Sequence, residues 1–553
     1  MIAVLADDAE RAVVSEFFEL FKTPWEFYRS DLQYDVLICS HAQFQNSSAK
    51  LVLIYGDGHR GFDRENGIEI LSQRSDAVLS YKGDRIPIYG SCLTFKGAGI
   101  VALVEEQTGE STGLEIASRE QKFLRLGFDL FEQIRLLLTH GQPSIHAHIP
   151  TLDLHIALLR DLITTRSIPL VEIAPVPAGY NFIACLTHDI DHAGIRNHKC
   201  DHTMLGFLYR ALVGSLINFC RGRRTIRQLA VNWFAAFSLP FVYLGLAKDF
   251  WNQFDRYIDI EKGLTSTFFV IPKKGDPGQN SEGPAPSRRA ARYGLEEIGP
   301  QLHRLISARR EMALHGIDAW HDAARGRTEL EAIRRVTGGS DVGVRMHWLF
   351  FNERSPATLE KAGFSYDSTV GYNETIGYRA GTTQVFKPLE LERMLELPMH
   401  IMDTALFFPG YMNLSPKGAR DAVGGLVKNA TRFGGVLTVN WHDRSIAPER
   451  LWDESYIELL EDLKTKEPWF STATEAVSWF KKRRSAVVET VIGDGKAMRV
   501  KVSLNRNSDD LPGLRIRIHN AAAQPTHLST PADSETQVAE MILNRSEEMK
   551  IPL

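Results

Sequence analysis

The feature that most constrains the fold is an alternation of strand-like and helical runs between residues 181 and 484. Short apolar runs are separated by longer stretches whose apolar residues recur at helical spacing. Alternation of this kind predicts a parallel sheet or barrel. The strand-like runs are Phe182–Leu186, Ser266–Ile271, Met312–Leu314, Val342–Val344, Leu397–Ile401 and Val436–Asn440, and the helical runs include Leu295–Ser307, Arg327–Val336 and Ser455–Thr465.

The length of 553 residues predicts several domains. Apolar runs around a helical pattern near the N-terminus indicate a small α/β domain, and β-like runs near the C-terminus indicate a β-rich extension. The predicted parts are an α/β domain over residues 1–120, a helical connector over 121–180, the barrel over 181–484 with an insertion at about 195–262, and the extension over 485–553 with a disordered stretch at 521–535.

Composition gives expectations about compartment and partners. The net charge of −4 is small for this length, so we expect no nucleic-acid partner. The five cysteines form an odd set without a CxxC pair, which favours a reducing compartment. The N-terminus turns acidic at Asp7 before any apolar signal region develops, so a cytoplasmic location is expected, with membrane association left open.

One stretch of the insertion, Gln228–Ala247, carries no charge and follows the basic run Arg221–Arg227. A run of this length is just long enough to span a bilayer, but Pro240 would break such a helix in the middle. We therefore favour an apolar hairpin that lies on a membrane or packs under the active site predicted below. Residues 221–247 suit an anionic lipid surface, although a solvated helix face explains the basic residues equally well.

The first strand-like run of the barrel ends in the motif THDIDH, residues 187–192. Because side chains alternate along a strand, Asp189 and Asp191 should share one face, with His188 and His192 on the other. Two converging carboxylates with imidazoles nearby are a common design for a metal-hydrolase site. The alternative is a capped strand end whose Asp residues begin a helix.

Reactive side chains also follow three later strand-like runs. His315 ends one of them, Arg345 and His347 end the next, and His442 follows the last. A single histidine after a strand is more often structural than functional. Several strand ends that carry Asp, His and Arg in one domain predict a shared site, because function gathers at the C-terminal ends of parallel strands.

With these motifs in this order, the region Pro175–Arg484 resembles the polysaccharide deacetylase family, the metal-dependent N-deacetylases with chitooligosaccharide-deacetylase (NodB) homology. It is most similar to a large bacterial branch whose opening motif reads THDxDH. The resemblance implies an irregular, incomplete parallel β/α barrel. Its motifs are THDIDH at 187–192, STFFVIP at 266–272, LHGIDAW at 314–320, GVRMHWL at 343–349, AGFSYDSTVGYNETIGYRAGT at 362–382, LPMHIMD at 397–403 and NWHD at 440–443.

The resemblance also implies roles for individual residues. A divalent metal polarises the acetamide carbonyl and lowers the pKa of a bound water, a carboxylate accepts that water's proton, and an imidazole protonates the leaving amine. By resemblance, the general base is Asp189, the metal ligands include Asp191 and His315, Arg345 orients the base, His442 is the general acid, and Asp367 supports that acid.

The sequence departs from the family pattern at the second histidine ligand. The family places two ligand histidines four residues apart, but Ala319 stands four residues after His315. A zinc site needs about three protein ligands plus water. We therefore predict a divalent metal, with zinc favoured, and take His321 as the third ligand. The alternatives for this third ligand are His188, His192, Asp318 and His347.

Substrate contacts are expected from side chains near the motifs, because sugar rings stack on aromatic residues. The leading hypothesis is a hydrolase that removes N-acetyl groups from a sugar of a bacterial polysaccharide or lipid-linked glycan. One alternative is a glycan-binding or scaffold protein without catalysis, which Ala319 favours, and another is an amide hydrolase for a small nitrogenous substrate. The expected substrate-binding residues are Trp320, His347, Trp348, Arg379 and Trp441.

Overall fold

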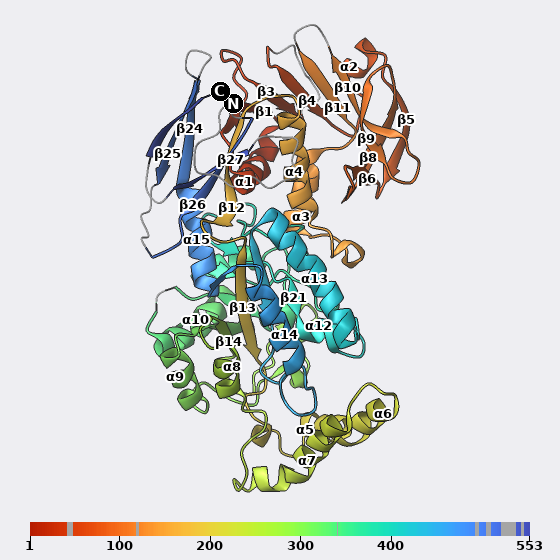
Figure 1. Cartoon of the computed structure of the whole chain (residues 1–553). Coiled ribbons are helices and arrows are strands. Elements are labelled where there is room, and N and C mark those ends of the chain that lie inside the picture. Colours follow the sequence, from red (N-terminus) through yellow and green to blue (C-terminus); the bar gives the residue numbers. More distant parts are fainter. Residues whose placement is uncertain are drawn as a thin grey trace.

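Three parts of the molecule are stacked along its long axis (Figure 1). The N-terminal sheet and the C-terminal strands lie at one end, a parallel sheet with its helices forms the middle, and a helical insertion forms the other end. The structure is a computed structural model, and it describes residues 1–40, 48–117, 121–339, 341–492, 497–504, 510–520, 538–543 and 547–552.

The middle part is built on a curled sheet of nine strands within the described residues, and all of its strand pairings are parallel. Its order is β20-β19-β18-β17-β14-β13-β22-β21, with β23 beside β13, so the described strands form an incomplete barrel. The strands are β13 (Ile183–Ile190), β14 (Thr267–Val270), β17 (Glu311–Gly316), β18 (Val344–Met346), β19 (Tyr366–Asp367), β20 (Leu395–Glu396), β21 (Ile401–Met402), β22 (Val436–Asn440) and β23 (Trp469–Ser471).

Three of these strands differ from the predicted runs, and one of them is β18, which begins at Val344, where the run predicted over Val342–Val344 ends. The first strand was expected to end at Leu186, but β13 continues to Ile190 because β14 pairs with residues 187–190. In the run predicted over Leu397–Ile401, residues 397–400 are instead a loop between the two short strands β20 and β21, and only Ile401 lies in a strand. Asp189 therefore lies within a strand, and Asp191 follows directly after it.

Helices cover this sheet, and the apolar core lies between them and the strands. Phe268, Leu314 and Leu437 of the sheet belong to one buried cluster with Leu330 and Leu460 of the helices. The covering helices are α8 (Phe254–Ile260), α9 (Gly299–Ser307), α10 (Ala323–Thr337), α11 (Ser355–Ala362), α12 (Asp403–Phe407), α13 (Pro416–Phe433), α14 (Asp453–Lys464) and α15 (Ala473–Ser485).

The N-terminal part contains a mixed sheet of eleven strands in the described portion of the chain. The sheet extends past residue 120, because β11 pairs in parallel with β4. Its elements are β1 (Ile2–Leu5), α1 (Arg11–Phe21), β2 (Trp25–Phe27), β3 (Val36–Cys39), β4 (Leu51–Tyr55), α2 (Gly61–Glu65), β5 (Glu69–Ser75), β6 (Val78–Tyr81), β7 (Asp84–Pro87), β8 (Ser91–Lys96), β9 (Ile100–Glu105), β10 (Ser111–Ala117) and β11 (Lys122–Leu126).

The segment predicted as a helical connector contains strands as well as helices. After β11 come α3 (Leu130–Thr139), α4 (Thr151–Thr164) and β12 (Leu170–Pro177). β12 pairs with β26 (Leu514–His519) and so joins a C-terminal sheet with β27 (Val538–Leu543). A second C-terminal sheet holds β24 (Ala486–Ile492), β25 (Ala497–Leu504) and β28 (Glu547–Pro552). The stretch predicted to be disordered, 521–535, lies outside the described residues.

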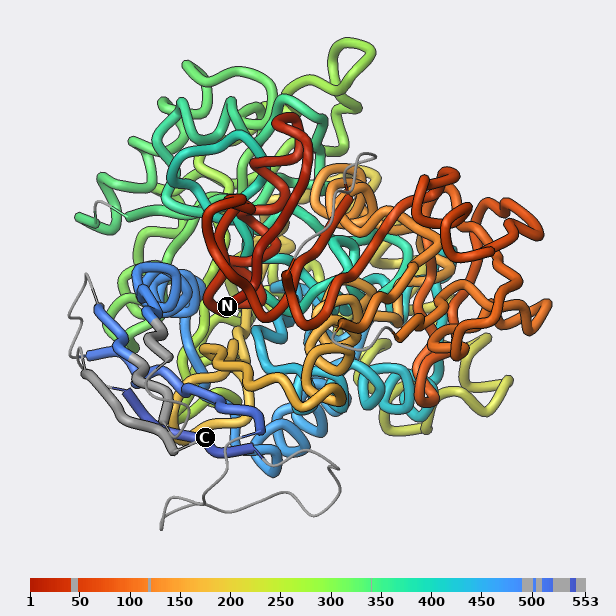
Figure 2. The backbone as a smooth tube through the Cα atoms, turned by 90° about the horizontal axis from the view of Figure 1, so that it is seen from above, coloured from red at the N-terminus to blue at the C-terminus, as the bar shows by residue number. Residues whose placement is uncertain are grey.

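Arg483 of α15 connects the barrel to the N-terminal part. In Figure 2 the N-terminal part lies over the barrel. Its buried guanidinium donates to the carbonyl oxygens of Ile173 in β12 and of Glu19 and Leu20 in α1, and to the amide oxygen of Gln384. One side chain thus satisfies backbone acceptors from two separate elements.

We expect Arg483→Met to lower the free energy of unfolding by about 3 kcal/mol, because each buried acceptor left without a donor costs about 1–3 kcal/mol. Urea denaturation followed by circular dichroism measures the change. The matched control is Arg420→Met, which removes an exposed ion pair with Glu458 and should change the free energy by less than about 1 kcal/mol. Equal effects of the two substitutions would contradict this role of Arg483.

Candidate metal centre and active site

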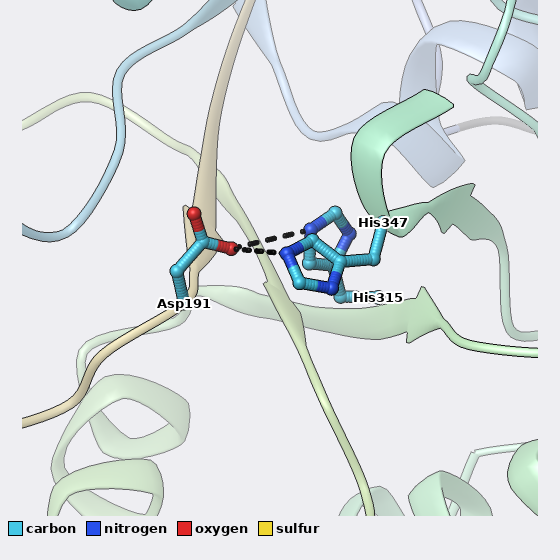
Figure 3. A group of neighbouring side chains, drawn as sticks. All are labelled: Asp191, His315 and His347. Atoms are coloured by element: carbon cyan, nitrogen blue, oxygen red, sulfur yellow. Dashed lines mark ion pairs between the residues drawn. The ribbon is translucent and has the colours of Figure 1, made fainter. Parts of the chain in front are cut away.

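Three side chains from three strand ends converge at one point (Figure 3). Asp191 follows β13, His315 lies near the end of β17, and His347 follows β18. Their ligand atoms lie within 4.8 Å of one another. The Nε2 atoms of both histidines are 3.5 Å from Oδ1 of Asp191. Parallel strands place their C-terminal ends on one edge, which explains how distant parts of the sequence form this three-ligand group.

The three-ligand group has the donor set of a divalent-metal site. The buried Oδ1 of Asp191 has no hydrogen bond within the described residues and faces the two imidazole nitrogens. Nδ1 of His315 lies 3.0 Å from the carbonyl oxygen of Arg345, which can only accept, so Nδ1 is the donor of this hydrogen bond and Nε2 is the ring nitrogen directed at Asp191. One carboxylate oxygen and two imidazole nitrogens form a donor set that suits a divalent metal such as zinc.

The third ligand candidate, His347, is held through its backbone. Arg289, fully buried in the segment before α9, donates to the carbonyl oxygens of His347 and Ile317. Trp348, the next residue, has a φ of 64°, a left-handed conformation that bulky residues rarely adopt. The chain therefore turns sharply after β18, and this turn directs both His347 and Trp348 into the cleft described below.

Asp189 lies beside the three-ligand group but has different partners. Its Oδ1 accepts from Arg345 at 2.9 Å, and its Oδ2 accepts from the Asn440 side chain at 2.8 Å. Burial alone would raise the pKa of Asp189, but Arg345 and His315 outweigh burial and hold that pKa below its ordinary value. Asp189 is therefore an ionised carboxylate, with Oδ2 3.9 Å from Nε2 of His315.

His442 approaches the same point from β22. Its Nδ1 lies 2.6 Å from Oδ1 of Asp403, and its Nε2 lies 4.0 Å from Oδ2 of Asp191. Burial would lower the pKa of His442, but the Asp403 carboxylate outweighs it and raises the pKa to about 9. The imidazole is thus protonated near neutral pH and can donate a proton through Nε2.

These groups lie at the base of a cleft with a volume of about 560 Å³. Aromatic and basic side chains form much of its wall, a combination that suits a polar ligand with apolar faces, such as a sugar. The lining includes Asp189, Asp191, His315, His347 and His442, together with Arg288, Trp348, Phe350, Asn373, Phe408, Tyr411 and Arg450.

The structure places His321, predicted as the third ligand, outside the three-ligand group. Its Nε2 lies 3.2 Å from Asp318, and the other oxygen of Asp318 pairs with Arg325. The chain has already left β17 at this point and is about to enter α10. His347, one of the alternatives, occupies the third place instead, so Ala319 does not leave the group short of a ligand.

The two histidines of the opening motif also lie outside the three-ligand group. His188 is fully buried, and its ring nitrogens lie 2.7 Å from the carbonyl oxygen of Trp441 and 2.7 Å from Glu261. His192 directs Nδ1 toward His198, 3.2 Å away. The rings of both histidines therefore contact neighbouring residues of the protein, while the two carboxylates of the motif line the cleft.

Asp367, the predicted partner of the general acid, does not contact His442 in the structure. It accepts a hydrogen bond from Thr369, and burial raises the pKa of Asp367 to about 6. Asp403 is the residue that contacts His442, through both the ring nitrogen and the backbone N–H. Sequence reasoning missed this role, although Asp403 closes the motif LPMHIMD directly after a short strand.

The predicted substrate-binding residues fall into two groups. His347 and Trp348 line the cleft. Trp320 and Trp441 are instead buried within the core of the barrel. Arg379 donates to the carbonyl oxygen of Gly371 and does not appear in the cleft wall.

Comparisons with known proteins give distant structural likenesses. No family model matches the sequence, and none of the curated proteins matches it. A protein of Mycobacterium smegmatis assigned as a polysaccharide deacetylase is 17% identical, with 56% of this chain and 95% of that chain covered and a TM-score of 0.34. The PuuE allantoinase is 15% identical, with coverage of 56% and 93% and a TM-score of 0.32. A protein of Pseudomonas aeruginosa PAO1, described as a probable polysaccharide deacetylase, is 13% identical, with coverage of 55% and 92% and a TM-score of 0.34.

The two competing third ligands can be separated by substitution. Loss of a residue that only hydrogen-bonds to a metal ligand lowers metal affinity roughly 10- to 100-fold. We expect His347→Ala to lower zinc affinity by more than this, because it removes one of three ligands. The matched control, His321→Ala, should leave zinc affinity unchanged. Competition with a chromophoric zinc chelator measures both affinities. Loss of zinc in the His321 variant and retention in the His347 variant would reverse the assignment.

Proposed function

We propose that the protein is a metal-dependent hydrolase that removes N-acetyl groups from a sugar of a bacterial polysaccharide or lipid-linked glycan. The observation that carries the proposal is the meeting of an ionised Asp189, a protonated His442 and the three-ligand group at the base of one cleft. Hydrolysis of an amide needs a proton acceptor for water and a proton donor for the leaving nitrogen, and these two residues have the matching charge states.

The residues divide the work of the reaction between them. A divalent metal held by Asp191, His315 and His347 would supply Lewis acidity to the amide carbonyl and to a water molecule. Asp189 is oriented by Arg345 and by Asn440, and its carboxylate accepts the proton of the attacking water. His442 Nε2 then donates a proton to the nitrogen as the C–N bond breaks.

Asp403 maintains His442 in the state that this step requires. Its carboxylate fixes the proton on Nδ1, orients the ring and stabilises the imidazolium. The backbone of His442 is also held, because the Tyr257 hydroxyl donates to the His442 carbonyl oxygen at 2.7 Å. Asp403 is therefore a positioning residue that acts through His442.

The shape of the cleft supports a glycan as substrate. Trp348, Phe350, Phe408 and Tyr411 line its wall with aromatic rings, on which sugars commonly stack, and Arg288 and Arg450 offer donors to hydroxyl or carboxylate groups. A binding protein without catalysis is favoured less than the sequence suggested, because His347 offers the third ligand that Ala319 does not.

The first functional prediction concerns the general base. Wild-type protein loaded with zinc should release acetate from an N-acetylglucosamine oligomer, and Asp189→Asn should reduce the rate by roughly 10²- to 10⁴-fold, because the amide cannot accept the water's proton. Zinc content should stay at the wild-type level, since Asp189 lies outside the three-ligand group. Acetate release by the variant at the wild-type rate would exclude Asp189 as the base.

The second functional prediction separates the two candidate partners of His442. Asp403→Asn should lower kcat by roughly 10²-fold or more with little change in KM, because the imidazole loses the carboxylate that keeps it protonated and oriented. Asp367→Asn is the matched control and should leave kcat within a few-fold. Both constants come from the same acetate-release assay. A kcat that falls with Asp367→Asn but not with Asp403→Asn would instead support Asp367, the residue predicted from the sequence, as the partner of His442.

A further inference from the structure

The insertion between β13 and β14 carries a large apolar surface that has no partner among the described residues. It consists of α5 (His202–Leu208), the π-helical turn η4 (Tyr209–Gly214), α6 (Ser215–Cys220) and α7 (Ile226–Tyr243). Figure 1 shows these helices at the end of the molecule opposite the N- and C-terminal strands. The surface therefore lies away from every other part of the fold except the barrel rim.

The helix α7 has two distinct faces. Its inner face belongs to a buried cluster with Phe207, Trp251 and Ala447, so the helix is fixed to the rim of the barrel. Its outer side chains recur at helical spacing and point to solvent, with Phe234 77% and Phe237 67% exposed. The exposed apolar residues of α7 and the turn after it are Ile226, Val231, Trp233, Phe234, Phe237, Phe241, Leu244 and Leu246.

The preceding helices extend the same kind of surface. Leu205 and Tyr209 are each more than half exposed, and Val213, Leu216, Ile217 and Phe219 are also exposed. Soluble proteins rarely expose contiguous apolar patches of this extent unless the patch binds a membrane or another protein.

The charge of the insertion distinguishes between these partners. No acidic residue occurs between Asp201 and Asp249, although the whole chain has a net charge of −4. The basic residues in this interval are Arg210, Arg221, Arg223, Arg224, Arg227 and Lys248. Two copies of such a surface would repel each other, whereas an anionic lipid surface attracts it and accepts its aromatic side chains.

The packing of the insertion also indicates how it would lie. The run His202–Cys220 is long and apolar enough to cross a membrane by length and composition. However, Phe207 and Ala211 of this run are buried against α7 and the barrel rim. A helix anchored on one face and apolar on the other lies in the plane of the membrane interface.

We propose that residues 202–248 form a docking surface for an anionic lipid bilayer, with the exposed aromatic side chains in the interface and the exposed basic residues Arg221, Arg223 and Arg227 against the headgroups. Docking would hold the cleft close to the membrane, because Arg224 donates to the carbonyl oxygens of Glu449 and Arg450, and the Arg450 side chain lines the cleft. The proposal does not depend on the chemistry of the cleft.

The test is co-sedimentation of the full chain with phosphatidylcholine vesicles and with vesicles that also contain phosphatidylglycerol. We expect binding to the anionic vesicles that weakens as salt rises. The triple variant Arg221→Ser/Arg223→Ser/Arg227→Ser should reduce partition roughly a hundredfold, since each basic residue contributes about fivefold near an anionic surface. Phe234→Ser/Phe237→Ser should also reduce binding to the anionic vesicles, because it removes two apolar side chains from the membrane interface.

The matched apolar control is Ile100→Ser/Ile145→Ser, which removes two equally exposed apolar side chains far from the insertion and should not change vesicle binding. Circular dichroism checks that every variant is folded. The proposal is overturned if the wild type fails to bind anionic vesicles, or if both insertion variants bind like the wild type. It is also overturned if light scattering shows a dimer that only Phe234→Ser/Phe237→Ser dissociates. None of these readouts uses acetate release, so they stand apart from the proposed activity.

Discussion

The candidate site depends most on the buried ion pair between Arg345 and Asp189. Arg345 is fully buried, and besides Asp189 its guanidinium donates to Thr187 of β13 and to Ser368, which directly follows β19, so its polar contacts connect two strands that are not adjacent in the sheet. A buried charge is tolerated only when it is paired and hydrogen-bonded in this way. The carbonyl oxygen of the same residue contacts Nδ1 of His315. One arginine thus fixes the proposed base with its side chain and a proposed metal ligand with its backbone.

This arrangement also explains how two similar carboxylates acquire different roles. Asp189 and Asp191 share one side of the chain, as the alternation along a strand requires. The oxygens of Asp189 are occupied by donors from Arg345 and Asn440, so it is held as a fixed anion. Oδ1 of Asp191 faces imidazole nitrogens and is free to ligate a metal. The difference arises from the side chains that β18 and β22 direct at Asp189 and not from the motif itself.

The sequence predicted the parts of the site that follow from strand periodicity. Alternating runs place His315, Arg345 and His442 at the C-terminal edge of one parallel sheet, and the structure brings them together there. His321, predicted as the third ligand, lies closer to His315 in the sequence than His347 does. Proximity in the sequence is a poor guide once a strand has ended, since the chain turns toward α10 before His321. His347 follows the neighbouring strand directly, so it remains at the edge of the sheet.

Other parts of the structure depend on features that periodicity does not encode. Asp403 follows a strand of only two residues, too short for its pattern to be recognised. The packing of the insertion is a second such feature. Its composition revealed an uncharged stretch but not which side chains face the barrel. The structure shows that Asp249 accepts from the backbone N–H groups of Ile195 and Arg196, directly after the opening motif. Trp251 packs against His192 of that motif. The segment that positions Asp191 therefore also anchors the insertion, so the proposed metal site and the proposed membrane surface form one continuous framework.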